Sequence, residues 1–452
     1  MKLMSLFDGS GGFPLAASLC GIEPVYASEV EPYPIAVTKS RFPNMKHLGD
    51  VSRIKGAEIE PVDIITFGSP CQDMSVAGKR AGLKHTAIGD EETTRSGLFM
   101  EAIRIIKEMR VKTNGIYPRF AVWENVPGAF SSNKGEDFRT VLEEFIRVKE
   151  KDAVMPPVPK AGWAYADYIR GDGWSVAYRT FDAQYWGVPQ RRRRIYLVAD
   201  FTGQRAGEIL LKPEGLRRNS AQSGTQGQET ARCAKNSVGT AIGGVDRYNQ
   251  SFLSGLAQTL RTSGGGDCTP RNGIGADDND RLVFSFDSLS SNSMKSSNPH
   301  SGCRSVKIAK TLDTSTQDPS KNQGGIAVIE KYVYGTRVNG DGETVPIRYI
   351  VRRLTPTECA RLQGFPDLWG HLNKKESFTD EEYKFWIEVR NAYAKINNKA
   401  VKDYTKAQIL TWYNKLHTDS AEYKMWGNGI ALPNALYVMQ GIAEVVGVHH
   451  SK

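Results

Sequence analysis

The chain has 452 residues, of which 40% are hydrophobic and 24% charged, and its formal net charge is +9 at pH 7. This is ordinary globular composition, with room for two or three domains. No run of 18 apolar residues and no basic leader with an apolar core occurs, so we expect neither a transmembrane helix nor a secretory signal. The six cysteines form no C-x-x-C pair, which speaks against a zinc site or disulfide framework and favours a reducing, cytoplasmic setting.

Residues 1–200 alternate short apolar runs with helical patterns, which predicts a mostly parallel α/β sheet. Strands are expected at 3–7, 25–28, 63–68, 120–124, 176–181 and 195–199. Helices are expected near 32–42, 97–111 and 136–150.

The composition changes after residue 200, and residues 201–345 are rich in Ser, Thr, Gly, Asn and Gln. A disordered insert is one interpretation, but regularly placed apolar clusters at 282–286, 326–329 and 332–334 favour a small β-rich domain with Gly turns. Patterned sequence returns at 346, reads as helical and charged from 376 to 425, and closes with an apolar helix at 435–446. We therefore expect units at 1–200, 201–345 and 346–452, with a helical insert near 372–424.

A Gly-rich turn follows the first strand, with the sequence Phe7-Asp8-Gly9-Ser10-Gly11-Gly12-Phe13. Such a turn between a strand and a helix lets a nucleotide approach the backbone closely. The second strand ends about 20 residues later at Ser28-Glu29, where an acid can accept hydrogen bonds from ribose hydroxyls. The pair indicates a nucleoside cofactor, although a tight strand–helix turn without any ligand would look the same.

Two chemically reactive side chains follow later strands. The strand at 63–68 ends in Gly68-Ser69-Pro70-Cys71-Gln72, which puts a thiol at the edge of the sheet where α/β ligand sites form. Most free cysteines are buried hydrophobes, but this one follows Pro in a loop beside the cofactor turn. The strand at 120–124 ends in Glu124, so a carboxylic acid would emerge at the same edge and suit covalent catalysis on a ring.

Four consecutive arginines, 191–194, lead into the strand at 195–199. A charge run alone would indicate a nucleic-acid patch or a solvated face. Because a strand alternates its faces, Arg192 and Arg194 should share one side and Arg191 and Arg193 the other. One pair can then face a catalytic pocket, while the other faces phosphate or solvent.

In this order the motifs resemble those of the C5-cytosine DNA methyltransferase family, over about 300 residues. The resemblance implies a Rossmann-like S-adenosylmethionine-dependent methyltransferase domain with a smaller β-rich target-recognition domain inserted at about 201–345. The matching segments are 7–13, 28–30, 49–51, Pro70-Cys71-Gln72, Glu124-Asn125-Val126, Gln190 with Arg192 and Arg194, 353–366, and Gly427-Asn428 with Pro433.

The resemblance also assigns roles. Its catalytic residues are Cys71, Glu124, Arg192 and Arg194. Its S-adenosylmethionine-binding residues are Phe7, Asp8, Gly9, Gly11, Gly12, Phe13, Glu29, Val30, Asp50, Val51, Pro70, Leu98 and Asn428, and its substrate-binding residues are Gln72, Ser75, Asn125 and Gln190. Asp8 and Ser10 stand where many relatives have small or apolar residues, at positions expected to offer mostly backbone.

By this resemblance a cytosine flipped out of duplex DNA is attacked at C6 by the Cys71 thiolate, while Glu124 donates to N3. C5 then takes the methyl group, and no metal is needed. The expected partner is double-stranded DNA, and the chain is expected to be a monomer. Recognition is assigned to 201–345 from motif order and not from charge, because that segment has 17 Lys and Arg against 14 Asp and Glu.

Three alternatives stay open from the sequence. An RNA-methylating relative of the same fold usually has a short recognition segment and a Cys-Phe-Thr motif, which is absent here. A catalytically inactive DNA-binding relative would not need all four catalytic residues, and a nicotinamide oxidoreductase would leave most motifs unexplained. A restriction-modification enzyme with a cognate endonuclease and an orphan enzyme both fit. Two inserts, near 150–172 and 372–424, receive no function.

Overall fold

The computed structural model describes residues 1–69, 97–155, 157–212 and 354–447 with their side chains. It also describes the backbone of four strands, at 281–286, 303–305, 326–333 and 347–353. Pro70, Cys71, Gln72 and Ser75 lie outside the described residues.

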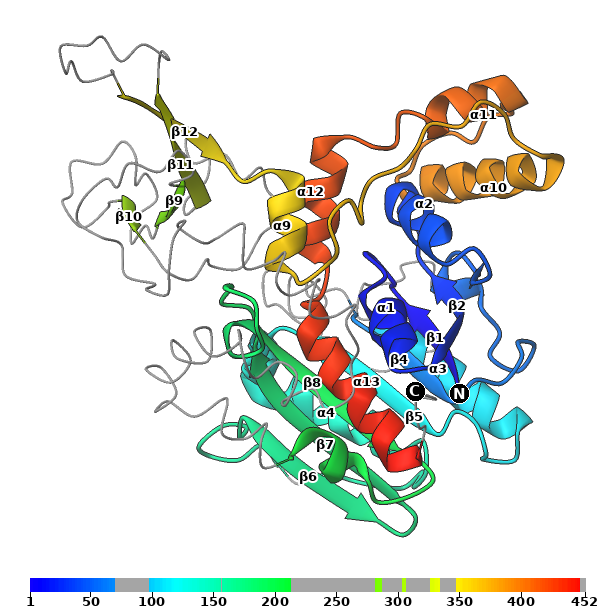
Figure 1. Ribbon diagram of the computed structural model, residues 1–452. Helices are drawn as coiled ribbons and strands as arrows, with labels where there is room; N and C mark the ends of the chain where they lie inside the picture. The colour runs from blue at the N-terminus through cyan, green and yellow to red at the C-terminus, as the bar shows by residue number, and fades with distance from the viewer. Residues whose placement is uncertain are drawn as a thin grey trace.

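An eight-stranded sheet forms the centre of the molecule, in the order β3-β2-β1-β4-β5-β8-β7-β6 (Figure 1). Its strands are β1 (Lys2–Leu6), β2 (Glu23–Ser28), β3 (Lys46–His47), β4 (Ile64–Phe67), β5 (Phe120–Asn125), β6 (Ala166–Gly171), β7 (Trp174–Asp182) and β8 (Arg193–Asp200). The first five strands in this order pair in parallel, and β8, β7 and β6 pair antiparallel.

The sheet is therefore mixed, whereas the sequence pattern predicted a mostly parallel sheet. The difference arises where no crossover helix separates successive strands. β6 and β7 are joined by a tight turn at 172–173, and β7 and β8 by the short segment 183–192, so each strand must return antiparallel to the one before it. β6 was not predicted and lies in the insert near 150–172.

Helices cover both faces of the large sheet (Figure 1). On one face, α3 (Gly97–Lys112) and α4 (Glu136–Ile146) pack Phe99, Phe138 and Phe145 against the strands. On the other face lie α1 (Gly12–Leu19), α2 (Pro32–Arg41), α5 (Ala206–Leu210) and α13 (Leu432–Val446). The prediction of an S-adenosylmethionine-dependent methyltransferase type of α/β fold agrees with this layered arrangement.

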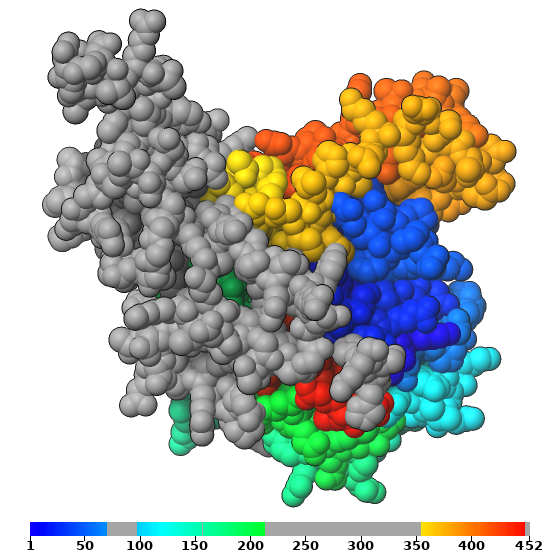
Figure 2. Space-filling view, viewed as in Figure 1, coloured from blue at the N-terminus to red at the C-terminus, as the bar shows by residue number. Residues whose placement is uncertain are grey.

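The segment after residue 353 is helical, with α9 (Pro356–Leu362), α10 (Asp380–Ile396), α11 (Lys406–Tyr413) and α12 (Asp419–Asn428) before α13. Thr355, Thr379 and Thr405 each form a capping box with Glu358, Glu382 and Gln408 respectively, which explains where three of these helices begin. α10 and α11 account for most of the insert near 372–424, and Figure 2 shows that they form one continuous surface with α2.

A separate four-stranded antiparallel sheet has the order β10-β9-β11-β12. Its strands are β9 (Arg281–Phe286), β10 (Cys303–Ser305), β11 (Ile326–Val333) and β12 (Ile347–Arg353). β12 lies after the expected boundary at 345, and α5, which was expected in the inserted segment, packs on β7 and α13 of the large unit. The expected domain boundaries themselves stay a prediction.

Among the described helices, none is by itself long and apolar enough to span a membrane. The bent pair formed by α12 and α13 passes that test on length and composition only when the two helices are taken together.

Candidate functional site

Four functional segments meet at one edge of the large sheet. Because β2, β1, β4 and β5 are parallel neighbours, their carboxyl ends lie side by side. Glu29 follows β2, the Gly-rich turn follows β1, Gly68 follows β4, and Glu124 is in the last turn of residues of β5. Ligand sites of open α/β sheets form at this edge.

The Gly-rich turn has the backbone geometry that its sequence requires. Phe7, Gly9 and Gly11 have positive φ values of 54°, 54° and 75°, a region that glycine adopts without steric cost. Beyond Gly9 the space is open, since a methyl group there would meet only the Phe7 carbonyl, at 3.8 Å. The open side of Gly9 lets a ligand approach the backbone of the turn closely.

The turn is supported from behind by residues distant in the sequence. The indole Nε1 of Trp369 donates to the Ser10 carbonyl at 2.8 Å. Cβ atoms added at Gly11 and Gly12 would come within 2.7 Å of Thr38 and 2.5 Å of Ile430. These two glycines are thus required by packing against α2 and the segment before α13, and they do not themselves line the pocket described below.

Glu29 is held at the end of β2 by three backbone donors. Its Oε2 accepts from Gly9 N at 2.8 Å, and its Oε1 accepts from Val30 N at 2.7 Å and Glu31 N at 2.9 Å. Burial raises the pKa of the Glu29 carboxyl, and the three N–H donors oppose that rise. The acid is therefore tied to the cofactor turn itself, as a ribose-binding carboxylate at this position should be.

The end of β4 is fastened to β5. Ser69 Oγ accepts from Trp123 Nε1 and from Asn125 Nδ2, both at 3.1 Å. A Cβ at Gly68 would lie 3.1 Å from Glu124 Oε2, so the glycine lets the chain pass close to the acid. Ser69 is the last described residue before the segment that carries Cys71, whose starting point is thus fixed beside Glu124.

Glu124 is buried and paired with Arg194, whose Nε lies 3.1 Å from Glu124 Oε1. The pair forms because β8 is antiparallel to β5: the amino end of β8 lies at the carboxyl end of β5, with Glu124 opposite Tyr196. Burial raises the pKa of Glu124, while the charges of Arg194 and Arg192 oppose the rise. A carboxyl group poised in this way can hold a proton and donate it.

The four arginines alternate between two environments, as predicted. Arg192 is buried and Arg194 largely so, whereas Arg191 and Arg193 are exposed. Arg192 donates from Nη2 to the carbonyls of Gly429 and Gly427, which ties the start of β8 to the end of α12. The contacts of Arg192 therefore include the backbone beside Asn428, and its side chain braces the pocket wall.

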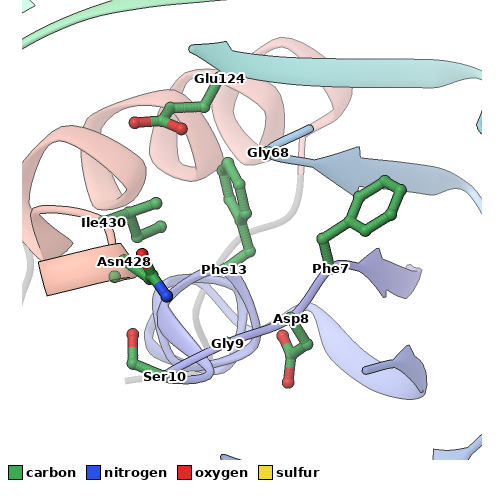
Figure 3. Close-up of a pocket in the computed structure, with 10 residues that line it drawn as sticks. Phe7, Asp8, Gly9, Ser10, Phe13, Gly68, Glu124, Asn428 and Ile430 are labelled. Atoms are coloured by element: carbon green, nitrogen blue, oxygen red, sulfur yellow. The ribbon is translucent and has the colours of Figure 1, made fainter. Parts of the chain in front are cut away.

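A pocket joins the cofactor turn to Glu124 (Figure 3). Figure 3 shows Glu124, Phe13 and Ile430 on one side of the turn and Asp8 projecting from the other. The residues that line it are Phe7, Asp8, Gly9, Ser10, Phe13, Gly68, Glu124, Asn428, Gly429 and Ile430. Six of these were expected site residues; Ser10, Gly68, Gly429 and Ile430 were not.

Other expected site residues lie near the pocket without lining it. Val30 donates its N–H to Glu29, Asp50 caps the short helix at 51–53 through Ser52 N at 3.0 Å, and Val51 is in the core. Leu98 packs against the core at the start of α3, Asn125 holds Ser69, and Gln190 is fully buried. The roles expected for these residues stay predictions.

The residues missed by the sequence analysis became visible only through folding. Gly68 precedes the Pro-Cys-Gln motif and gave no signal apart from its glycine. Gly429 and Ile430 adjoin the last motif, so a wider reading of that motif would have included them. Of the cysteines whose side chains are described, Cys20 and Cys359 are both buried and neither lines the pocket.

Comparison with known proteins gives a family. The family model described as C-5 cytosine-specific DNA methylase matches residues 1–149 and 165–385 of this chain. The match spans the Gly-rich turn, the Pro-Cys-Gln motif, Glu124 and the arginine run, and it leaves out 150–164, which lies within the first predicted insert.

Individual relatives are distant. A DNA N-6-adenine-methyltransferase of Escherichia phage P1 is 27% identical over 98% of this chain, and this chain spans 61% of that protein. The orphan methyltransferase M.SPRI of Bacillus phage SPR is 26% identical, over 81% of this chain and 89% of its own. A crystal structure of the S. pombe Dnmt2 methyltransferase has a TM-score of 0.49 at 15% identity, covering 99% of each chain.

Proposed function

Because the chain belongs to the family of C-5 cytosine-specific DNA methylases, we propose that it transfers a methyl group from S-adenosylmethionine to C5 of a cytosine in duplex DNA. The resemblance inferred from the motifs is confirmed by the family match. One observation carries the proposal for this chain: a single pocket is lined by both the cofactor turn and the buried acid Glu124. A methyl donor and a proton donor can therefore act on one base.

The residues present fit the cofactor. Gly9 leaves the turn open, Glu29 is positioned at the end of β2 to accept from ribose hydroxyls, and Phe7 and Phe13 supply apolar surface to the pocket. When bound, S-adenosylmethionine supplies an activated methyl group on its sulfonium. We assign it Phe7, Asp8, Gly9, Phe13, Glu29 and Asn428 from this geometry, and keep Gly11, Gly12, Val30, Asp50, Val51, Pro70 and Leu98 as family assignments.

The proposed chemistry begins at Cys71. Its thiolate adds to C6 of a flipped-out cytosine and forms an Sγ–C6 bond, while Glu124 donates a proton to N3. C5 becomes nucleophilic and takes the methyl group; loss of the C5 proton then allows the Sγ–C6 bond to break. Arg194 holds Glu124 in place, and Ser69 fixes the start of the segment that must bring the thiol to the base.

The remaining parts of the proposal concern partners. We propose that the small sheet β10-β9-β11-β12 belongs to an inserted target-recognition domain that reads base edges, and that Gln72, Ser75, Asn125 and Gln190 serve the DNA substrate. We further propose a monomer acting in the cytoplasm, with or without a cognate endonuclease. The phage P1 relative supports methylation of DNA in general, but its printed adenine product belongs to a longer protein.

A covalent trap tests the proposed chemistry. Duplex DNA with 5-fluorocytosine at the target lacks the C5 proton that must leave, so the Cys71 adduct should accumulate. A protein–DNA complex stable to denaturation should appear with S-adenosylmethionine present, and disappear in Cys71→Ser. If methylation of ordinary DNA occurs but no trapped complex ever forms, the proposed covalent route is wrong.

A further inference from the structure

Asp8 is a buried carboxylate for which the proposed chemistry has no use. It follows β1 in the Gly-rich turn, its side chain is only 8% exposed, and it lines the pocket. Both carboxylate oxygens are inaccessible to solvent, and within the described part of the chain neither has a donor in good hydrogen-bond geometry. The hydroxyl of Ser5 is the nearest polar group.

The electrostatic surroundings of Asp8 make an ionised carboxylate costly in the free protein. Burial raises the pKa of Asp8 to about 8; the Ser5 hydroxyl opposes the rise, and the neighbouring charge of Glu29 adds to it. Natural chains rarely keep a buried acid without a partner, because the desolvation cost is not returned. A small residue, as many relatives have at this position, would avoid that cost.

The pocket as a whole favours a positive ligand. Among its described lining residues there are two carboxylates, Asp8 and Glu124, and no Lys or Arg. Arg194 compensates Glu124 from outside the pocket, at 3.1 Å, but no described cation does the same for Asp8. The missing counter-charge is therefore expected to come from the ligand.

We propose that Asp8 is the counter-charge for the ammonium group of the cofactor's methionine moiety. This inference rests on the proposed function, because it takes S-adenosylmethionine as the ligand of the pocket. Glu29, held by three backbone donors at the end of β2, is the carboxylate assigned to the ribose. Asp8 lies in the turn after β1, between Glu29 and the Glu124 side of the pocket, where the amino-acid part of the cofactor would run.

The assignment makes Asp8 a specificity-determining residue. A charge-assisted hydrogen bond in a dry site is among the stronger polar interactions, so its loss should weaken binding about tenfold or more. The loss should be confined to ligands that carry the ammonium group. It should be absent for a ligand that keeps the adenine and ribose but lacks the amino-acid moiety.

Calorimetric binding to the full-length protein tests this with three ligands. S-adenosylmethionine and S-adenosylhomocysteine both carry the ammonium group, and methylthioadenosine does not. Asp8→Asn and Asp8→Ala should each bind the first two at least tenfold more weakly than wild type, and bind methylthioadenosine unchanged. Glu29→Gln serves as the matched control, since loss of a ribose contact should weaken all three ligands.

Each outcome decides a different point. Equal weakening of all three ligands in the Asp8 variants would overturn the ammonium assignment in favour of a ribose contact. Unchanged binding of all three would overturn any ligand role for the side chain. If wild-type protein binds none of them, the proposed function fails instead. Thermal unfolding without ligand checks the fold, and Asp8→Asn should be no less stable than wild type at pH 8.

Proton release gives an independent reading. With Glu29 and Ser5 as the facing groups, free Asp8 is largely protonated at pH 7 and must ionise to pair with the ammonium. Wild type should therefore release a proton on binding S-adenosylmethionine at pH 7, seen as a dependence of the binding heat on buffer ionisation. Asp8→Asn should lose this release. Identical proton release in both proteins would contradict the pairing.

Discussion

The Nε atom of Arg194 lies 3.1 Å from Oε1 of Glu124, although the two residues stand on antiparallel strands 70 positions apart in the chain. The side chains are 12% and 10% exposed, so solvent screens the pair only weakly. The pair fixes both the direction of the acid and its readiness to give up a proton. It is the clearest link between the order of the strands and the proposed chemistry.

Removing Arg194 should change the pH dependence of methylation. The positive charge of Arg194 lowers the pKa of Glu124, so Arg194→Gln should raise that pKa. Because protonated Glu124 is the proposed donor to N3, the fall in rate on the alkaline side should move to higher pH. Single-turnover methylation measured across pH tests this.

Arg193→Gln is the matched control, because Arg193 is adjacent but exposed on the other face of β8. It removes the same charge without touching Glu124, so its pH profile should follow that of wild type. Equal shifts in both variants would show that general surface charge, and not the buried pair, sets the profile.

Glu124→Gln should lower the methylation rate by ~10²–10⁴ while duplex DNA still binds, since loss of one acid–base group has typically this effect. The amide keeps the size of the side chain beside Gly68 but cannot donate a carboxyl proton. Single-turnover kinetics and a DNA-binding titration separate the two effects. A near-normal rate would remove Glu124 from the mechanism.

Cys71→Ser should abolish methylation and leave S-adenosylmethionine binding intact. A hydroxyl is a far weaker nucleophile than a thiolate near neutral pH, and the cofactor turn after β1 is a separate segment. Transfer of tritium from labelled S-adenosylmethionine and calorimetric cofactor binding are the two measurements. Substantial turnover by the Ser variant would mean that another group attacks the base.

The choice of DNA sequence should depend on residues 201–345 and their continuation through β12. Replacing this segment with the equivalent segment of a relative should move methylation to the relative's site, because each bidentate base contact supplies ~1–3 kcal/mol of discrimination. Cofactor affinity should stay unchanged. Bisulfite sequencing that still found the original site methylated would direct attention to the inserts near 150–172 and 372–424.

Local sequence predicted the turn, Glu29 and Glu124 because strand ends in a parallel sheet share one edge. The arginine run was assigned to the correct faces because strand alternation depends only on position. What local sequence did not reveal was strand direction: Arg194 reaches Glu124 only because β8 runs antiparallel to β5.

Long-range packing was equally invisible. The Trp369 indole supports the Ser10 carbonyl across 359 positions of sequence, and Ile430 packs against Gly12 from the segment before α13. Neither side chain belongs to a pattern with a helical or strand period. The boundary of the inserted segment was also hard to predict, since α5 is short and follows the polar turn at 201–205.

The identity of the methylated nucleoside tests the central claim most directly. Unmethylated duplex DNA should be incubated with the purified protein and S-adenosylmethionine, digested to nucleosides and analysed by mass spectrometry. Our account predicts 5-methyl-deoxycytidine in wild-type reactions and none with Cys71→Ser. Formation of N6-methyl-deoxyadenosine in its place, or 5-methyl-deoxycytidine produced equally by Cys71→Ser, would contradict it.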